Sequence, residues 1–482
     1  MNVDELIGKL RGRLGENSVL VEATDIAKYL HDWRGRHVGK ARCVVLPRDT
    51  GEVSAVLRAC FEAAVPVFPQ GGNTSVCGGS VPSPGGEGTV LSLERMNRIR
   101  SLQPRDHSII VEAGCVLSDV QQAARQAERY FPLSLGAEGS CQIGGNIATN
   151  AGGTSVLRYG NMRDLVLGLE VVLPDGRVWD GLRTLRKDNS GYDLKNLFIG
   201  SEGTLGVVTA AALKLFALLP NTLTAMFALH DVEQAVALGE RLQQRFGAEL
   251  VALELMSRSE LEIVLRHIPD SVPPMAEPGQ WQLLVELSSA QEESALLEQL
   301  HSCVEDAVEH GLVADAIVAA NARQRERLWH IRHHVTEANR LEGMGLTHDI
   351  AVPVYRIPEF IARAQAMLEQ HYPAARVVIV SHLGDGNLHY ICMHSHEAWR
   401  AMPDGPAYQA RLAHDLYDIA ATLGGTFSAE HGIGSLHVQE MVTYKQPLEL
   451  ELMHHVKALF DPRGIMNPGR VLRPPPGLTP AR

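Results

Sequence analysis

Two hydrophobic patterns divide the chain into parts with different architecture. In the range 42–216, short apolar runs of strand length alternate with glycine-rich connectors and modest helical stretches, which predicts strands joined by glycine loops in an α+β arrangement. Beyond residue 220 the helical patterns are longer, as in 232–246 and 321–342, and they surround the strand-like runs WQLLVEL and ARVVIVSH. This second part is predicted to be a sheet covered by helices on one face.

The composition argues against several classes of function. The chain has 482 residues and a formal net charge of −12, so a broad basic face for nucleic acid is not expected. The longest apolar runs have strand length, which predicts no transmembrane segment. The amphipathic N-terminus lacks the apolar core of a signal peptide, which predicts a cytoplasmic protein. The seven cysteines are scattered without a C-x-x-C spacing and are expected to be reduced.

Three glycine-dense loops, at 69–80, 135–153 and 199–206, lie in the first part of the chain. Glycine allows backbone N–H groups to turn toward an anion and allows a ligand to approach the backbone closely. One such loop would fit tight turns equally well, but three together indicate a long ligand that lies against backbone. Neither G-x-G-x-x-G after a strand nor the P-loop motif occurs, which argues against a Rossmann nicotinamide site and a nucleotidase.

The motifs in these loops resemble those of one family. PQGGNTSVCGGSVP, LGAEGSCQIGGNIATNAGG and LRKDNSGYDLKNLFIGSEGTLGVVT are similar to segments of the FAD-linked D-2-hydroxy-acid dehydrogenases, in the vanillyl-alcohol-oxidase superfamily, and most of all to the D-2-hydroxyglutarate dehydrogenases. The resemblance runs from about residue 32 to 472 and implies an α+β fold. Its parts would be a PCMH-type FAD-binding domain over 1–219 (core about 38–217), an α+β substrate (cap) domain over 220–425, and a C-terminal segment, 426–482, that returns to the FAD domain.

By this resemblance the glycine loops hold FAD. Some relatives attach the flavin through a histidine in the first loop, but this loop has no histidine between Pro69 and Ser80, so the resemblance implies noncovalent FAD. The resemblance also implies that Asn467 contacts FAD, although a simple Asn-Pro turn would account for this residue equally well. The implied FAD-binding residues are Pro69, Gln70, Gly71, Gly72, Asn73, Thr74, Ser75, Gly79, Ser80, Gly136, Ala137, Gly139, Ser140, Ile143, Gly144, Gly145, Ala148, Asn150, Gly152, Glu202, Gly206, Val208 and Asn467.

A pair of histidines flanks a glycine-rich turn in the segment 381–390. The Gly-Asp-Gly-Asn centre can reverse the chain, which would place His382 opposite His389 at a distance that lets two imidazoles share one metal ion. Histidines that only hydrogen-bond at a turn would show the same spacing. The resemblance makes His382, His389 and Glu430 the ligands of a divalent ion, with zinc favoured over manganese or iron, and makes His431 the catalytic base.

The substrate residues are implied in the same way. Arg332 and Thr336 are four apart, so on one helix they would share a face, and a guanidinium can bind a carboxylate with two hydrogen bonds. A solvated arginine would fit the segment as well; the resemblance makes this pair the carboxylate clamp, with His348 as a further substrate residue. The hydroxyglutarate enzymes place a lysine and a tyrosine where Thr347 and His348 stand here, so a positive charge for a second carboxylate is lost.

The sequence therefore predicts an FAD-dependent dehydrogenase that oxidises a small anionic D-2-hydroxy acid to the 2-oxo acid. D-2-hydroxyglutarate is the first choice of substrate, and D-lactate and glycolate are the alternatives. Electrons would pass to an electron-transfer flavoprotein or a quinone, and a homodimer is compatible with the chain. The sequence also leaves open two hypotheses from other functional classes: a non-catalytic flavin- and metal-binding protein, and a flavin-free zinc hydrolase.

Overall fold

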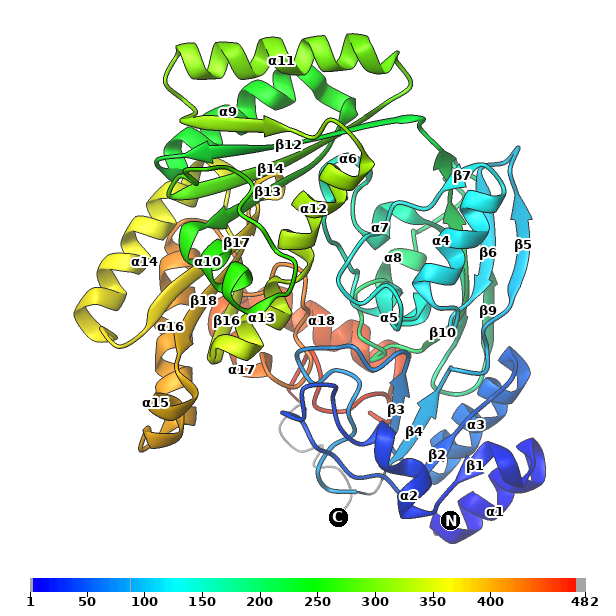
Figure 1. The fold of residues 1–482 in the computed structure, drawn as a ribbon. Helices are drawn as coiled ribbons and strands as arrows, with labels where there is room; N and C mark the ends of the chain where they lie inside the picture. The colour runs from blue at the N-terminus through cyan, green and yellow to red at the C-terminus, as the bar shows by residue number, and fades with distance from the viewer. Residues whose placement is uncertain (1–2, 87, 474–482) are drawn as a thin grey trace. The chain divides into compact units, whose positions relative to one another are not determined.

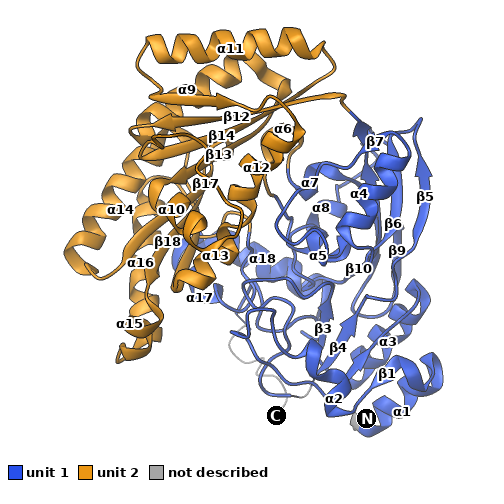
Figure 2. Cartoon of the chain, in the orientation of Figure 1, with its two compact units in different colours: residues 1–152, 161–218, 431–482 blue, residues 153–160, 219–430 orange. Residues whose placement is uncertain are grey.

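A computed structural model describes residues 3–86 and 88–473 and divides the chain into two compact units (Figure 2). Unit 1 comprises Met1–Gly152, Asn161–Leu218 and His431–Arg482, and unit 2 comprises Gly153–Gly160 and Leu219–Glu430. The short segment Gly153–Gly160, which the sequence pattern did not separate from its surroundings, belongs with the second unit. The proline-rich tail after Arg473, for which the sequence predicts disorder, lies outside the described residues.

Unit 1 contains a four-stranded sheet at the N-terminal end of the chain. Its strand order is β1 (Val19–Leu20), β2 (Cys43–Val45), β4 (Thr89–Ser92) and β3 (Val67–Gln70), and the last three strands are parallel. These strands are continuous apolar runs because helices and loops bury both faces of a parallel sheet. The helices packed on it are α1 (Val3–Leu14) and α3 (Thr50–Ala63), which bury Leu6, Leu10, Val53, Val56 and Leu57.

A second, antiparallel sheet of unit 1 has the strand order β5 (Ile99–Gln103), β6 (Ser108–Glu112), β10 (Val207–Lys214), β8 (Val166–Val172) and β9 (Val178–Gly181). The C-terminal segment joins the first sheet instead: Val67 donates to the carbonyl of Ile465, and Asn467 donates to that of Val67. The predicted return of the C-terminal segment is therefore observed as backbone pairing along β3.

Short elements complete unit 1. They are η1 (Glu16–Ser18), α2 (Ala23–Ile26), η2 (Ala27–Tyr29), α4 (Leu117–Gln126), β7 (Arg129–Tyr130), α5 (Ile143–Ala148), α7 (Met162–Leu165), α8 (Lys195–Phe198), β11 (Phe216–Ala217), α17 (Val438–Tyr444) and α18 (Pro447–Phe460).

Unit 2 is built on a seven-stranded antiparallel sheet (Figure 1). Its strand order is β15 (Asp315–Val318), β12 (Asn221–Leu229), β14 (Trp281–Ser289), β13 (Leu250–Ser257), β17 (Arg376–His382), β18 (Asn387–His394) and β16 (Met344–Ala351). The other elements are α6 (Val156–Tyr159), α9 (Val232–Phe246), η3 (Gly247–Glu249), α10 (Arg258–His267), α11 (Glu293–Glu309), α12 (Ala322–His333), α13 (Val335–Glu342), η4 (Val354–Arg356), α14 (Ile357–His371), η5 (Leu383–Asp385), α15 (His396–Ala401) and α16 (Gly405–Thr422).

Helices cover both faces of this sheet, so the prediction of one covered face is wrong. Ile391 belongs to a core shared with α10, α12 and α13, whereas the ring of the adjacent Tyr390 packs against Phe360 of α14, with ring centroids 5.7 Å apart. Successive side chains of a strand point to opposite faces, which places α14 opposite α10, α12 and α13. We call the face that carries Ile391 the α12 face.

One buried carboxyl group of unit 2 gives a testable pH dependence. Glu260 lies near the start of α10, where burial raises its pKa to about 8 despite a hydrogen bond from Asn339. Between the unfolded value near 4.5 and about 8, the folded chain holds a proton that the unfolded chain has released, so stability falls as the pH rises through this window.

Replacement of Glu260 by glutamine is expected to remove this loss, because the amide stays neutral. Relative to the wild type, the variant should gain stability between pH 5.5 and 8, by about 3 kcal/mol at most. The measurement is the unfolding temperature of both proteins at the two pH values, with the exposed Glu298→Gln on α11 as the control. Parallel pH profiles for Glu260→Gln and the wild type would contradict the prediction.

Candidate active site

The two predicted metal histidines lie on β17 and β18, which are joined by a tight turn. β17 ends at His382, η5 follows, and Gly386 takes a left-handed φ of 84°, a conformation that glycine adopts without steric cost. The register pairs His382 with Asn387, so the predicted pairing of His382 directly opposite His389 is wrong. The two histidines are diagonal neighbours on one face, and their ring centroids are 5.4 Å apart, which still allows both rings to reach one ion.

Glu430 completes a set of three donor atoms within unit 2. Its Oε1 lies 3.3 Å from Nε2 of His389 and 3.8 Å from Nε2 of His382. Donor atoms bound tetrahedrally to one zinc ion at about 2.0–2.1 Å stand roughly 3.4 Å apart, so the two distances from Glu430 are close to those expected around a single divalent ion. Two imidazole nitrogens and a carboxylate oxygen are also a chemically suitable set for zinc, manganese or iron.

Asp349, on β16, holds the segment that carries Glu430. Its Oδ2 accepts the N–H of Ala429 at 3.1 Å and that of Glu430 at 2.9 Å, and its Oδ1 accepts from the side chain of Asn387 at 2.8 Å. The donor atoms of Asp349, His389 and Glu430 all lie within 4.8 Å of one another. Asp349 is therefore both an anchor for the Glu430 segment and a further carboxylate at the edge of the donor set.

Each histidine has a second carboxylate on its other ring nitrogen. Nδ1 of His382 donates to Oε1 of Glu254 at 2.8 Å, and Nδ1 of His389 lies 3.7 Å from Oδ1 of Asp349. A hydrogen-bonded carboxylate at this position, as Glu254 is for His382, fixes the ring orientation of a metal-binding histidine and leaves the other nitrogen for the ion. Glu254 thus directs Nε2 of His382 toward Glu430, and Nε2 of His389 also lies on the Glu430 side.

The charges of this cluster favour a bound cation. Burial alone would lower the pKa of His382, but the negative charges and hydrogen bonds of Glu254 and Glu430 outweigh it and raise the pKa to about 10. Burial would raise the pKa of Glu430, and the two histidines instead hold it well below its usual range. Buried carboxylates require such compensation, which a divalent ion would supply in place of protons.

Arg332 joins this cluster through the same glutamate. The helical pattern predicted over 321–342 forms two helices, α12 and α13, which break at His334. Arg332, near the end of α12, is buried and donates from Nε to Oε2 of Glu254 at 2.7 Å. Thr336 is exposed on the first turn of α13, so the two residues do not share the face of one helix as predicted.

His348 does not fit its predicted role in substrate binding. It is opposite Tyr390 in the register of β16 with β18, its Nδ1 lies 3.1 Å from the Tyr390 carbonyl, and its ring packs against Tyr417 of α16. Its neighbour Asp349 is opposite His389, on the α12 face. Adjacent residues of a strand face opposite ways, so His348 points away from the donor set, and the exposed Thr347 lies on the face of Asp349.

The first two predicted FAD loops lie against each other in unit 1. A Cβ on Gly72 would come within 2.0 Å of the Ser140 carbonyl, and one on Gly144 would come within 2.8 Å of Ala113. Within the described residues, the backbone N–H groups of Gly71 to Ser75 donate to no protein acceptor. A run of N–H groups of this kind is suited to an anion such as a pyrophosphate, and a Cβ at Gly136, Gly139 or Gly145 would meet open space.

Several predicted FAD residues use their side chains to shape these loops. Gln70 donates to the carbonyls of Tyr29 and Ser80, and Asn73 donates to that of His31 and accepts from the Ser80 hydroxyl. These contacts hold the first loop against the segment from Tyr29 to His31 and tie its two ends together, so the loop can present its backbone to a ligand.

Glu202 and Asn467 connect the third loop to other parts of unit 1. Glu202 accepts the N–H groups of Ile433 and Gly434, both at 2.7 Å, and burial raises its pKa despite these bonds. Asn467 donates to the carbonyls of Gly79 and Glu202. Both side chains therefore hydrogen-bond to the backbone of other segments of unit 1. Their contacts with FAD stay predictions.

The sequence reading missed Glu254 and Asp349 as members of the cluster. Glu254 lies in the strand LVALELMS, whose residues are all buried, and a lone carboxylate in such a run is itself a sign of a specific partner. Asp349 follows Thr347 and His348 directly, and strand alternation would have placed it on the opposite face from His348.

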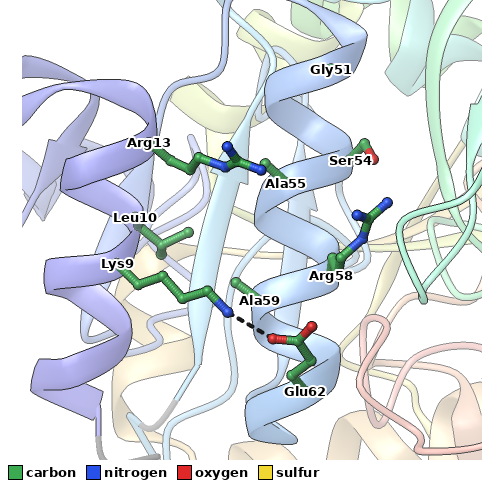
Figure 3. A pocket seen from close by; sticks show the side chains of 9 residues that line it. All are labelled: Lys9, Leu10, Arg13, Gly51, Ser54, Ala55, Arg58, Ala59 and Glu62. Atoms are coloured by element: carbon green, nitrogen blue, oxygen red, sulfur yellow. Dashed lines mark hydrogen bonds and ion pairs between the residues drawn. The ribbon is translucent and has the colours of Figure 1, made fainter.

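A separate pocket in unit 1 contains none of the predicted site residues. It lies between α1 and α3 and is bordered by Lys9, Arg13, Arg58 and Glu62 (Figure 3). The ion pair between Lys9 and Glu62, 2.7 Å long, joins side chains that are about half exposed, and such pairs contribute little to stability.

Comparison with known proteins identifies the family. Residues 41–181 match the model of an FAD-binding domain, and residues 219–471 match that of the C-terminal domain of FAD-linked oxidases. A D-2-hydroxyglutarate dehydrogenase of Xanthomonas citri pv. viticola is 36% identical over 93% of this chain and 93% of its own length. The mitochondrial D-2-hydroxyglutarate dehydrogenase of Bos taurus is 38% identical over 92% of this chain and 78% of its own.

The fold class is confirmed by solved structures. The structure of p-cresol methylhydroxylase with substrate bound superposes with a TM-score of 0.74, at 16% identity, and covers 97% of this chain and 96% of its own. At that identity the likeness concerns the fold alone, which is the predicted PCMH-type α+β architecture with its cap domain.

The prediction of a cytoplasmic protein is wrong by the same comparisons. The relatives from rice, cattle, rat and zebrafish are named as mitochondrial proteins, although the name of the bacterial relative carries no location. In the part of the chain that the structure describes, no helix has both the length and the apolar character needed to cross a membrane.

The family models and the relatives match nearly the whole length of the chain. The chain therefore belongs to the FAD-linked D-2-hydroxy-acid dehydrogenases and is an FAD-dependent oxidoreductase.

Proposed function

We propose that this enzyme oxidises the C2 hydroxyl of D-2-hydroxyglutarate to the 2-oxo acid, with a divalent ion at His382, His389 and Glu430. The observation that carries the proposal is the convergence of these three side chains in unit 2, with Glu430 Oε1 within 3.8 Å of both imidazole nitrogens. The relatives named D-2-hydroxyglutarate dehydrogenase support the choice of substrate.

The reaction removes a proton from the hydroxyl oxygen and a hydride from C2. When bound, FAD accepts the hydride and the divalent ion makes the hydroxyl more acidic. The chain would supply the remaining functions. His431, which directly follows Glu430, would accept the hydroxyl proton on its neutral imidazole. Arg332 would bind a substrate carboxylate with the two terminal nitrogens that its contact with Glu254 leaves available.

FAD in this proposal is held without a covalent bond, by the backbone of the first two glycine loops. Two observations support this: the run of N–H groups from Gly71 to Ser75 and the open space beside Gly136, Gly139 and Gly145. Because the first loop has no histidine between Pro69 and Ser80, the cofactor should leave the protein on acid precipitation. An electron-transfer flavoprotein or a quinone would reoxidise the reduced flavin.

Mixing the purified enzyme with D-2-hydroxyglutarate without oxygen is expected to bleach the flavin absorbance in a single turnover. The L-enantiomer should leave it oxidised, and D-lactate, glycolate and D-malate should reduce it more slowly. The measurement is stopped-flow absorbance with each acid over a range of concentrations.

The comparison of acids also tests the effect of Thr347, since the exposed threonine offers no charge to a second carboxylate. Faster reduction by D-lactate or glycolate would reassign the substrate to a monocarboxylic acid. A flavin that none of the acids reduces would contradict the proposed activity.

A further inference from the structure

Glu254 lies between two residues to which the proposed function gives different tasks. Oε1 accepts from Nδ1 of His382 at 2.8 Å, and Oε2 accepts from Nε of Arg332 at 2.7 Å. The glutamate comes from β13, the histidine from the neighbouring β17, and the arginine from α12. All three belong to unit 2, and the glutamate and histidine side chains share the α12 face because Glu254 is opposite His382 in the register.

The burial of this carboxylate makes both contacts strong. The side chain of Glu254 is 1% exposed, that of His382 is 8% exposed and that of Arg332 is 10% exposed. An ionised carboxylate at such depth needs hydrogen-bonded partners and a compensating positive charge. Here each oxygen accepts one hydrogen bond, and Arg332 supplies the positive charge. Displacement of either partner would leave part of a buried charge uncompensated, so the positions of His382 and Arg332 depend on each other.

We propose that Glu254 is a positioning residue that couples the metal site to the substrate-carboxylate site, by fixing the ring of His382 with one oxygen and the guanidinium of Arg332 with the other. The inference rests on the proposed function, in which His382 holds the ion and Arg332 binds the substrate. A carboxylate on the Nδ1 side directs Nε2 toward the ion. The same carboxylate uses the Nε–H of Arg332 and leaves its two terminal nitrogens for a planar, two-point contact with a carboxylate.

The neighbouring Glu286 provides a matched comparison. Glu254 is paired with Leu284 of β14, and Glu286 lies two residues further along that strand, so it is on the same face. Like Glu254, it accepts a hydrogen bond from α12; the donor is Trp329, at 2.6 Å. Its second contact is the hydroxyl of Thr224 at 3.3 Å. Both donors of Glu286 are neutral, and neither is a predicted metal or substrate residue. A purely structural role for buried carboxylates on this face would therefore give similar results for Glu254 and Glu286.

The first measurement is metal retention, which requires no substrate. Holoenzyme of the wild type, Glu254→Gln and Glu286→Gln is loaded with Zn²⁺, dialysed against graded nitrilotriacetate, and analysed for zinc per chain by mass spectrometry. The amide of Glu254→Gln can accept from only one of the two partners and carries no charge. We expect it to bind Zn²⁺ about 10–100-fold more weakly than the wild type, whereas Glu286→Gln should bind it as the wild type does.

The second measurement separates KM from kcat at saturating Zn²⁺, with whichever D-2-hydroxy acid reduces the wild-type flavin fastest. Glu254→Gln should raise KM about tenfold or more because Arg332 loses its anchor, and Glu286→Gln should leave KM unchanged. Unchanged zinc affinity and KM in Glu254→Gln would overturn the proposal, and a change in only one of them would overturn the coupling.

A charged variant keeps the test decisive if Glu254→Gln does not fold. Glu254→Asp retains the carboxylate but withdraws it by one methylene from both partners, so smaller losses of zinc affinity and of substrate affinity are expected together. Wild-type behaviour of this variant in both assays would also overturn the coupling. If no D-2-hydroxy acid reduces the flavin of the wild type, the proposed function is refuted. The zinc measurement would then still decide whether Glu254 positions His382.

Discussion

Replacement of His431 by alanine is expected to slow the reduction of the flavin by substrate by about 10²–10⁴-fold, while FAD stays bound. A neutral imidazole can accept a proton at neutral pH, and loss of a positioned general base has effects of this size. His431 directly follows Glu430, one of the three proposed metal ligands. The chain therefore brings the proposed base and a proposed ligand together by covalent connection, whatever the placement of the two units.

The measurement is the first-order rate of flavin bleaching at saturating substrate, together with the FAD content per chain. Free imidazole added to His431→Ala should restore part of the rate, because it can fill the space of the missing ring and take the proton. His437→Ala, six residues further along in the same unit, serves as the control and should reduce at the wild-type rate. Flavin reduction in His431→Ala as fast as in the wild type would remove the assignment of the base.

Local patterns in the sequence were sufficient to predict the parts of the site that depend on one turn or one loop. The hairpin that carries His382 and His389 could be predicted because a buried strand, a Gly-Asp-Gly-Asn turn and a second strand follow one another within 19 residues, from Arg376 to His394. The loop at 69–80 could be recognised for the same reason. The register was not predictable, since the four turn residues are 383–386, between the paired His382 and Asn387, and not the Gly-Asp-Gly-Asn stretch at 384–387.

Contacts between distant segments could not be read from the sequence. Glu254 is 128 residues before His382 in the chain, and the strand order that makes β13 and β17 neighbours depends on the packing of the whole sheet. The break between α12 and α13 at His334 is similar, because the helical period continues through it while the structure separates Arg332 from Thr336. The position of His348 is different: alternation along β16 could have shown that His348 and Asp349 cannot both face the donor set.

Replacement of Glu430 by glutamine is expected to remove the bound metal and to slow flavin reduction by about 10²–10⁴-fold, since a metal ion that polarises the reacting oxygen stabilises the transition state by several kcal/mol. Glu430 Oε1 lies between the two imidazoles, 3.3 Å from one and 3.8 Å from the other, so it contributes the negative charge that the histidines cannot supply. A carboxamide keeps the shape but offers only a neutral oxygen.

After treatment with a chelator, the wild type should reduce its flavin as slowly as Glu430→Gln does. Addition of Zn²⁺ or Mn²⁺ should restore the rate of the wild type at concentrations that do not restore that of the variant. Glu397→Gln, an exposed substitution on α15, provides the control for the change of charge. Full turnover of the chelated wild type would contradict a metal role. Wild-type zinc affinity in Glu430→Gln would instead leave the metal but remove Glu430 as its ligand. The carboxylate of Asp349, which lies within 4.8 Å of the donor atom of His389, would then be the residue to replace.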